Sequence, residues 1–164
     1  MDATARTQLF DTRRPWWLMV TMNTYRWRRL LSRLGTTDVE PLPVGIAVLE
    51  AWKRIPQHRP WVQAGEHVIM PDHFHGILRC GIAPRGRTGS IRHIIGGFKA
   101  EAVRLARASR ALGRSERLWH RSYYLGILDT PEAACRAARY IHNNPGVAIH
   151  AARPHAPLRR YDAR

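Results

Sequence analysis

Cysteine is scarce in this chain, in which Cys80 and Cys135 are the only two. Two thiols without metal-ligand spacing exclude a disulfide-rich scaffold and a cysteine-based zinc site. The 164 residues are numerous enough to bury about 70% of the unfolded surface without such crosslinks. We therefore expect a single domain over residues 1–164, with two reduced thiols in a cytoplasmic protein.

Long hydrophobic runs are also missing. The longest early apolar run, Trp16 to Val20, is far too short to span a bilayer, and the residues before it lack the apolar segment of a signal peptide. The sequence has no internal repeat, no coiled-coil heptads and no phosphate-binding glycine loop. These absences argue against a membrane partner, a repeat protein and a P-loop enzyme.

Acidic residues are few, since 12 Asp plus Glu accompany 27 Lys plus Arg and leave a net charge of +15. A chain with a pI near 11.4 attracts polyanions, and its binding should weaken steeply with salt. Only Lys53 and Lys99 are lysines, so a genome that favours arginine explains part of this pattern. Such a bias does not explain the shortage of acids, and we expect a nucleic-acid partner.

The positive charge is concentrated between Arg85 and Arg121. Apolar residues recur at helical spacing from Ile91 to Leu105, which predicts an amphipathic helix packed on a sheet with its basic side chains outward. A basic face that is only solvated is the alternative. The predicted DNA-binding residues are Arg85, Arg87, Arg92, Lys99, Arg104 and Arg107, with Lys99 the first to test.

Large aromatic side chains accompany this charge. Stacking on an unpaired base contributes about 1–3 kcal/mol in single-strand binders. Because large aromatics are on average highly buried, we expect about a third of them to face nucleic acid and the rest to lie in the core or at its edge. The candidates are Trp16, Trp17, Trp27, Trp61, Trp119 and Tyr123.

The triplet His73-Phe74-His75 directly follows an apolar run that begins at Val68. On an extended strand, side chains two residues apart emerge on one face, about 7 Å apart, and the residue between them points the other way. Two imidazoles placed in this way can hold one metal ion. A His-x-His triplet also arises by chance on protein surfaces, so a metal site requires a second element.

A helix near the C-terminus supplies the second element. Thr130 as N-cap, Pro131 at the first helical position and the alanine-rich run that follows predict a helix from Thr130 to Asn144 that ends at Pro145. Residues four apart share one face of a helix, so Tyr140 and Asn144 project together. A phenol and an amide oxygen therefore share one direction.

Hydrophobic periodicity predicts alternating strands and helices along the chain. Their order is that of a ferredoxin-like antiparallel sheet, β-α-β-β-α-β, with an added C-terminal helix that carries the tyrosine, which is an α+β fold. The predicted elements are strand 16–23, a basic, polar linker, helix 44–55, a hairpin of strands 63–70 and 73–80 with a turn at Pro71-Asp72, the basic helix after Ser90, strand 123–129, the tyrosine helix and an irregular basic tail over 148–164.

Four blocks of sequence carry a resemblance to a known family, and they occur in the family's order: HVIMPDHFHGILRC, IIGGFKAEAVR, LWHRSYYLGILD and RYIHNNPGVA. Together they resemble the HUH-type single-tyrosine transposases, and most closely the REP-associated tyrosine transposase branch. The match runs from about Trp16 to Val147, which is most of the chain.

The resemblance implies a metal-dependent endonuclease and strand transferase, associated with the bacterial nucleoid, that cuts and rejoins single-stranded DNA with hairpin structure through a 5′-phosphotyrosine. It implies that Tyr140 is the nucleophile and that His73, His75 and Asn144 hold a divalent metal ion, Mg or Mn. Zinc or nickel would also suit two imidazoles and one amide oxygen. The enzyme would act as a monomer or a homodimer, with the tyrosine serving its own subunit or a neighbour's.

The sequence departs from the family pattern at two positions. Asp72 stands where relatives most often have asparagine, and Gly126 stands where they commonly have a histidine. Glycine has no side chain that replaces an imidazole, so an accessory role of that histidine is in doubt here.

Two other functions stay open. The first is a domesticated or inactive relative that binds nucleic acid without cutting it. The second is a zinc hydrolase built on His73 and His75, which requires a further ligand and a base at metal spacing that the sequence does not offer.

Overall fold

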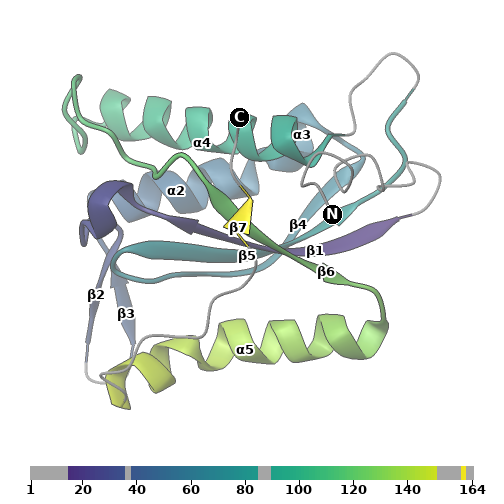
Figure 1. The fold of residues 1–164 in the computed structure, drawn as a ribbon. Coiled ribbons are helices and arrows are strands. Elements are labelled where there is room, and N and C mark those ends of the chain that lie inside the picture. The colour runs from purple at the N-terminus through teal and green to yellow at the C-terminus, as the bar shows by residue number, and fades with distance from the viewer. Residues whose placement is uncertain (1–14, 36–37, 85–89, 151–159, 162–164) are drawn as a thin grey trace.

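Strand β1 (Trp16–Asn23) lies at the centre of an antiparallel sheet, between β5 (His73–Cys80) and β6 (Tyr123–Leu128) (Figure 1). Strand β4 (Val62–Ile69) pairs with β5, and the two-residue strand β7 (Arg160–Tyr161) pairs with β6. The order β4-β5-β1-β6 is that of the predicted ferredoxin-like sheet, which is confirmed. The computed structural model describes residues 15–35, 38–84, 90–150 and 160–161.

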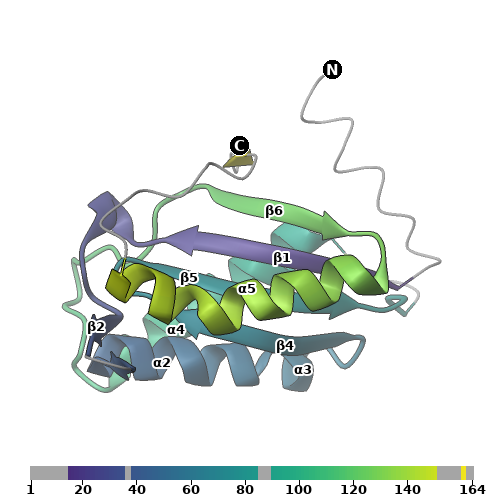
Figure 2. The ribbon, with the colours of Figure 1, turned by 90° about the horizontal axis from the view of Figure 1, so that it is seen from below.

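Helices cover both faces of the sheet (Figures 1 and 2). Helices α2 (Pro43–Lys53) and α4 (Ile91–Ala108) lie on one face with the short α3 (Ile55–His58), and α5 (Pro131–His150) crosses the other face. In the described part of the chain, no helix combines the length and the apolar character needed to cross a membrane.

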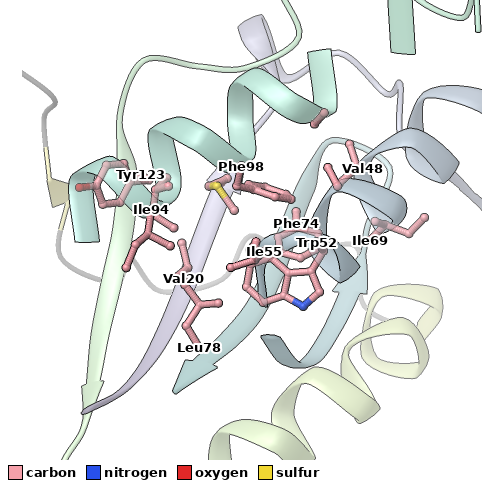
Figure 3. Packing of buried hydrophobic residues seen from close by; sticks show 14 of the residues in the cluster. Val20, Val48, Trp52, Ile55, Ile69, Phe74, Leu78, Ile94, Phe98 and Tyr123 are labelled. Carbon is pink, nitrogen blue, oxygen red and sulfur yellow. The ribbon is translucent and has the colours of Figure 1, made fainter. Parts of the chain in front are cut away.

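The main core fills the space between the sheet and helices α2 and α4 (Figure 3). The indole of Trp52 packs against the rings of Phe74 at 4.9 Å and Phe98 at 5.4 Å between centroids, and its Nε1 donates a hydrogen bond to the carbonyl of Gly65. Because side chains alternate along a strand, burying Phe74 here turns its neighbours His73 and His75 to the other face.

A smaller apolar cluster holds α5 against that other face. It consists of Met19 from β1, Ile77 from β5, and Ala137 and Ile141 from α5. Burying a side chain such as Ile141 contributes about 1.5–3 kcal/mol. The helix with the predicted nucleophile therefore packs on the same side of the sheet as both histidines.

Helix α5 is longer than predicted. Its N-terminus is as expected, because the Thr130 hydroxyl accepts a hydrogen bond from the Ala133 amide at 3.1 Å. The predicted end at Pro145 is wrong, since the helix continues through this residue to His150. Proline removes one backbone donor but has a helical φ, so a helix with enough packing elsewhere passes through it.

Other boundaries also differ from the prediction. The segment predicted to be a basic, polar linker contains a short hairpin of β2 (Ser32–Leu34) and β3 (Val39–Pro41). The sequence does not predict these strands, because strands of this length carry no recognisable alternation. The predicted helix 44–55 is divided into α2 and α3. The tail predicted to be irregular carries the last turn of α5 and the strand β7, while residues 151–159 and 162–164 lie outside the described part.

Candidate active site

The two histidines of the triplet lie side by side at the start of β5. Their ring centroids are 4.8 Å apart, with the planes at 79°. His75 is 4% exposed, whereas His73 lies closer to solvent. The predicted common orientation of the two imidazoles is thus present, and it follows from the burial of Phe74 on the opposite face.

A polar side chain supports each imidazole through its Nδ1 atom. The Thr21 hydroxyl lies 2.7 Å from His75 Nδ1, and Asp72 Oδ1 lies 2.7 Å from His73 Nδ1. This hydrogen bond from His73 holds the pKa of the Asp72 carboxyl below its usual range, against the effect of partial burial. A partner on Nδ1 fixes the ring and directs Nε2 toward a ligand, which is the usual arrangement of metal-binding histidines.

Tyr140 on α5 faces this pair of histidines. Its ring centroid is 5.5 Å from that of His75, and the planes meet at 76°. The side chain is 38% exposed, so it is open to a substrate. Partial burial raises the pKa of the phenol above its ordinary value, and the nearby Asn144 amide opposes that rise.

Asn144 lies one helical turn after Tyr140 and is 1% exposed. Its amide lies near the Tyr140 hydroxyl, yet within the described part of the chain neither its oxygen nor its nitrogen has a hydrogen bond of good geometry. A buried amide without such bonds is costly, which indicates a position kept for a ligand.

These side chains fit a divalent cation. The donors available are two imidazole nitrogens, from His73 and His75, and the amide oxygen of Asn144, a set that suits Mn, Zn or Ni and admits Mg. Among the residues described, no group of three His, Cys, Asp or Glu side chains is placed to hold a metal ion. Any site here therefore depends on the amide, and the metal-binding roles stay predictions.

Those predicted DNA-binding residues that the structure describes are not brought to this site. Helix α4 lies on the opposite face of the sheet from α5 (Figure 1). Arg92 is exposed on it, whereas the guanidinium of Arg104 is held by both carboxylate oxygens of Glu101 at 2.7 Å. Arg107 donates to the carbonyl of Glu116 at 3.3 Å. Arg85 and Arg87 lie outside the described residues.

Backbone carbonyls hold the ammonium group of Lys99 inside the fold. Its ammonium donates to the carbonyls of His120, Arg121 and Ser122, at 2.9, 3.3 and 3.2 Å, and lies 5.6 Å from the ring centre of Tyr123. Burial lowers the pKa of this lysine to about 8. The side chain thus fastens the segment before β6 to α4, and a role of Lys99 in binding DNA gains no support from its surroundings.

Of two further positions, Thr21 had no clear signal in the sequence, whereas Gly126 was already identified there as a departure. In the sequence Thr21 looks like any strand residue. Only the pairing of β1 with β5 places it opposite His75. Gly126, opposite Met19 in the sheet, has room for a side chain, because a Cβ there would lie 3.8 Å from that of Met19. A Cβ at this position would therefore not be crowded.

Comparison with known proteins found a relative in sequence and solved structures with a similar fold, among them the two given below. No family model matches the chain. An uncharacterized protein of Haemophilus influenzae is 29% identical, over 62% of this chain and 64% of that protein, so the match spans less than two thirds of the relative.

Both solved structures are similar to this chain in fold. A REP-associated tyrosine transposase bound to a REP hairpin has a TM-score of 0.56 at 17% identity, covering 81% of this chain and 68% of that one. A transposase-like protein of Deinococcus radiodurans has a TM-score of 0.52 at 17% identity, covering 77% and 88%. At this level of identity the likeness establishes a shared fold.

Proposed function

We propose that this chain is a metal-dependent endonuclease and strand transferase, a transposase of the HUH type, that acts on single-stranded DNA with hairpin structure. The proposal rests on one observation. Within one chain, the ring of Tyr140 lies beside that of His75, which in turn lies beside that of His73. The fold shared with a transposase bound to a REP hairpin and the net charge of +15 support it.

Tyr140 acts as the nucleophile. Its phenolic oxygen bonds to phosphorus, the bond from phosphorus to the 3′ oxygen breaks, and the phenol proton is released as the 3′ oxygen becomes a hydroxyl. The strand downstream of the break is left attached through its 5′ phosphate to Tyr140. Attack by a 3′ hydroxyl reverses these bonds and releases the tyrosine, so rejoining requires no ATP.

His73, His75 and Asn144 would hold the cation. A divalent metal ion supplies positive charge to the phosphoryl oxygens as the transition state forms. Because burial raises the pKa of Tyr140, the phenol is protonated near neutral pH and requires activation in the complex with DNA. The supports from Thr21 and Asp72 keep both imidazoles in place for that complex.

The test is a covalent adduct. The protein is incubated with Mn²⁺ and 3′-labelled single-stranded oligonucleotides that form hairpins, and the products are separated on a denaturing gel. We expect a labelled protein band that is lost in Tyr140→Phe and strongly reduced in His75→Ala.

Two variants serve as controls. Tyr123→Phe changes a tyrosine that lies in the main core (Figure 3), on the opposite face of the sheet from α5, and His93→Ala changes an exposed histidine on α4. Both should keep the adduct. Binding without any adduct would instead assign the chain to the non-cutting relatives, and metal-dependent hydrolysis that persists in Tyr140→Phe would assign it to the zinc hydrolases.

A further inference from the structure

The segment that follows β1 has an uncommon backbone. Arg26 and Trp27, in the short 3-10 helix Tyr25–Trp27, have φ values of 57° and 58°. This left-handed region is unfavourable for residues other than glycine, and non-glycine residues in it cost on the order of 1–3 kcal/mol each. Such a conformation persists where the surroundings impose it, and it is enriched at active sites, ligand-binding segments and switch regions.

Thr24 imposes the conformation. This buried residue donates its backbone amide to the carbonyl of Asp72 at 2.8 Å, and its hydroxyl lies 2.7 Å from the Arg28 carbonyl and 3.0 Å from the Asp72 carbonyl. The segment is thereby fastened to the turn that precedes His73, at the end of the sheet where β1 ends and β5 begins (Figure 1). Its position relative to the candidate active site is fixed.

The strained backbone presents an aromatic surface. The side chain of Trp27 is 57% exposed, the largest exposure of any described tryptophan. Before it in the sequence, the ring of Tyr25 has two guanidinium groups near it, with the Arg26 and Arg117 Cζ atoms 5.3 and 5.5 Å from its centre. An indole open to solvent therefore stands beside a cluster of cations.

Most arginines of the segment after β1 have no ion pair with a carboxylate in the described part of the chain. Arg26, Arg28 and Arg29 are exposed, and Arg28 alone of the three has an ion pair in the described part of the chain, with Glu116 at 2.8 Å. The hydrogen bonds from Thr24 to the Asp72 carbonyl place this segment beside the residue that supports His73. The segment thus joins the edge of the candidate active site to a positive, aromatic surface.

We propose that this surface, defined by Trp27, Arg26 and Arg29, binds one unpaired nucleotide of a single DNA strand. The base stacks on the Trp27 indole, and the phosphates on either side of it contact the two arginines. This inference rests on the proposed function, because it places the nucleotide on the strand that leads to His73. Asn23, the last residue of β1, pairs with His73, so the segment begins beside the first histidine.

The test measures binding apart from cutting. Each variant is made in the full chain that carries Tyr140→Phe, and the affinity for a fluorescent single-stranded oligonucleotide is measured by anisotropy in the presence of Mn²⁺. We expect Trp27→Ala to weaken binding by about 5- to 100-fold and Trp27→Phe to keep most of the affinity. Ile82→Ala is the control, since Ile82 is 59% exposed beyond Cys80, at the other end of β5 from His73.

A second measurement keeps the inference testable if Trp27→Ala folds poorly. Abasic sites are placed one at a time along the oligonucleotide and bound to the chain that retains Trp27. We expect one position at which loss of the base weakens binding as much as Trp27→Ala does, and no further loss when both changes are combined. Equal affinity of the Trp27→Ala and Ile82→Ala chains, or a flat abasic scan, would overturn the inference.

Adduct formation by the chain that retains Tyr140 distinguishes the nucleotide site from the proposed cutting activity. An adduct formed by a chain whose binding does not depend on Trp27 overturns the nucleotide site and leaves the cutting activity. Trp27-dependent binding without any adduct on Tyr140 supports the nucleotide site and overturns the cutting activity. Trp27-dependent binding to anionic phospholipid vesicles, with none to oligonucleotides, would overturn the inference in favour of a membrane surface.

Discussion

The ring of Tyr140 stands edge-on to the ring of His75, with centroids 5.5 Å apart. The tyrosine comes from the helix that covers the sheet and the histidine from a strand beneath it, and a small apolar cluster around Ile77 and Ile141 holds the two elements together. One chain therefore supplies both groups, so the proposed chemistry does not require a tyrosine from a second subunit.

The support of His75 by Thr21 gives the first prediction. Thr21→Val keeps the shape of the side chain but removes the hydroxyl that lies 2.7 Å from His75 Nδ1. We expect the affinity for Mn²⁺, measured by titration calorimetry, to fall by about 10- to 100-fold. Thr130→Val removes the hydroxyl that caps α5 and should leave this affinity unchanged. Equal affinities of the two variants would show that Thr21 does not position a ligand.

The buried amide of Asn144 gives the second prediction. Asn144→Leu replaces a buried polar group that lacks hydrogen bonds of good geometry, so it should raise the free energy of unfolding by about 1 kcal/mol while removing a metal ligand. Urea unfolding with EDTA measures the first effect, and Mn²⁺ titration measures the second. Asn143→Leu, at an exposed position on the same helix, should keep metal binding. A less stable Asn144→Leu protein would indicate that the amide is held by the fold itself.

The position of Lys99 gives the third prediction. Lys99→Met leaves three carbonyls, those of His120, Arg121 and Ser122, without their donor. We expect the free energy of unfolding to fall by about 1–3 kcal/mol, with little change in the oligonucleotide affinity of the folded protein. Lys53→Met, at an exposed site at the end of α2, is the matched control. A loss of DNA affinity with unchanged stability would restore the sequence-based prediction that Lys99 binds DNA.

The pH dependence of stability gives the fourth prediction. Burial lowers the pKa of Lys99 to about 8 in the folded state, from 10.5. Between these two pH values Lys99 binds more protons in the unfolded chain than in the folded chain. The contribution of Lys99 to the free energy of unfolding therefore rises as the pH rises from 8 to 10.5. Below pH 8 the contribution is constant.

Urea unfolding at several pH values checks this sign. The free energy of unfolding of the parent chain, less that of Lys99→Met, should increase over the alkaline range, and the same difference for Lys53→Met should not. A decrease would mean that the three carbonyls hold the ammonium more strongly than burial disfavours it.

Much of the architecture could be predicted from the sequence. Strands β1 and β5 have the predicted bounds, and the turn at Pro71-Asp72 is confirmed by the hydrogen bond from the Met70 amide to the His73 carbonyl. Long alternating or continuous apolar segments identify such strands because burial requires that pattern. Short strands such as β2 and β3, and the path of α5 through Pro145, depend on contacts with distant residues.

The sequence by itself determined which side chains share a face. The period of two along β5 aligns His73 with His75, and the helical period aligns Tyr140 with Asn144. Only the tertiary structure decided which faces meet, because strand order and helix placement depend on the packing of the whole core. That packing brings Thr21 to His75 and places the arginines of α4 on the opposite side of the sheet from Tyr140.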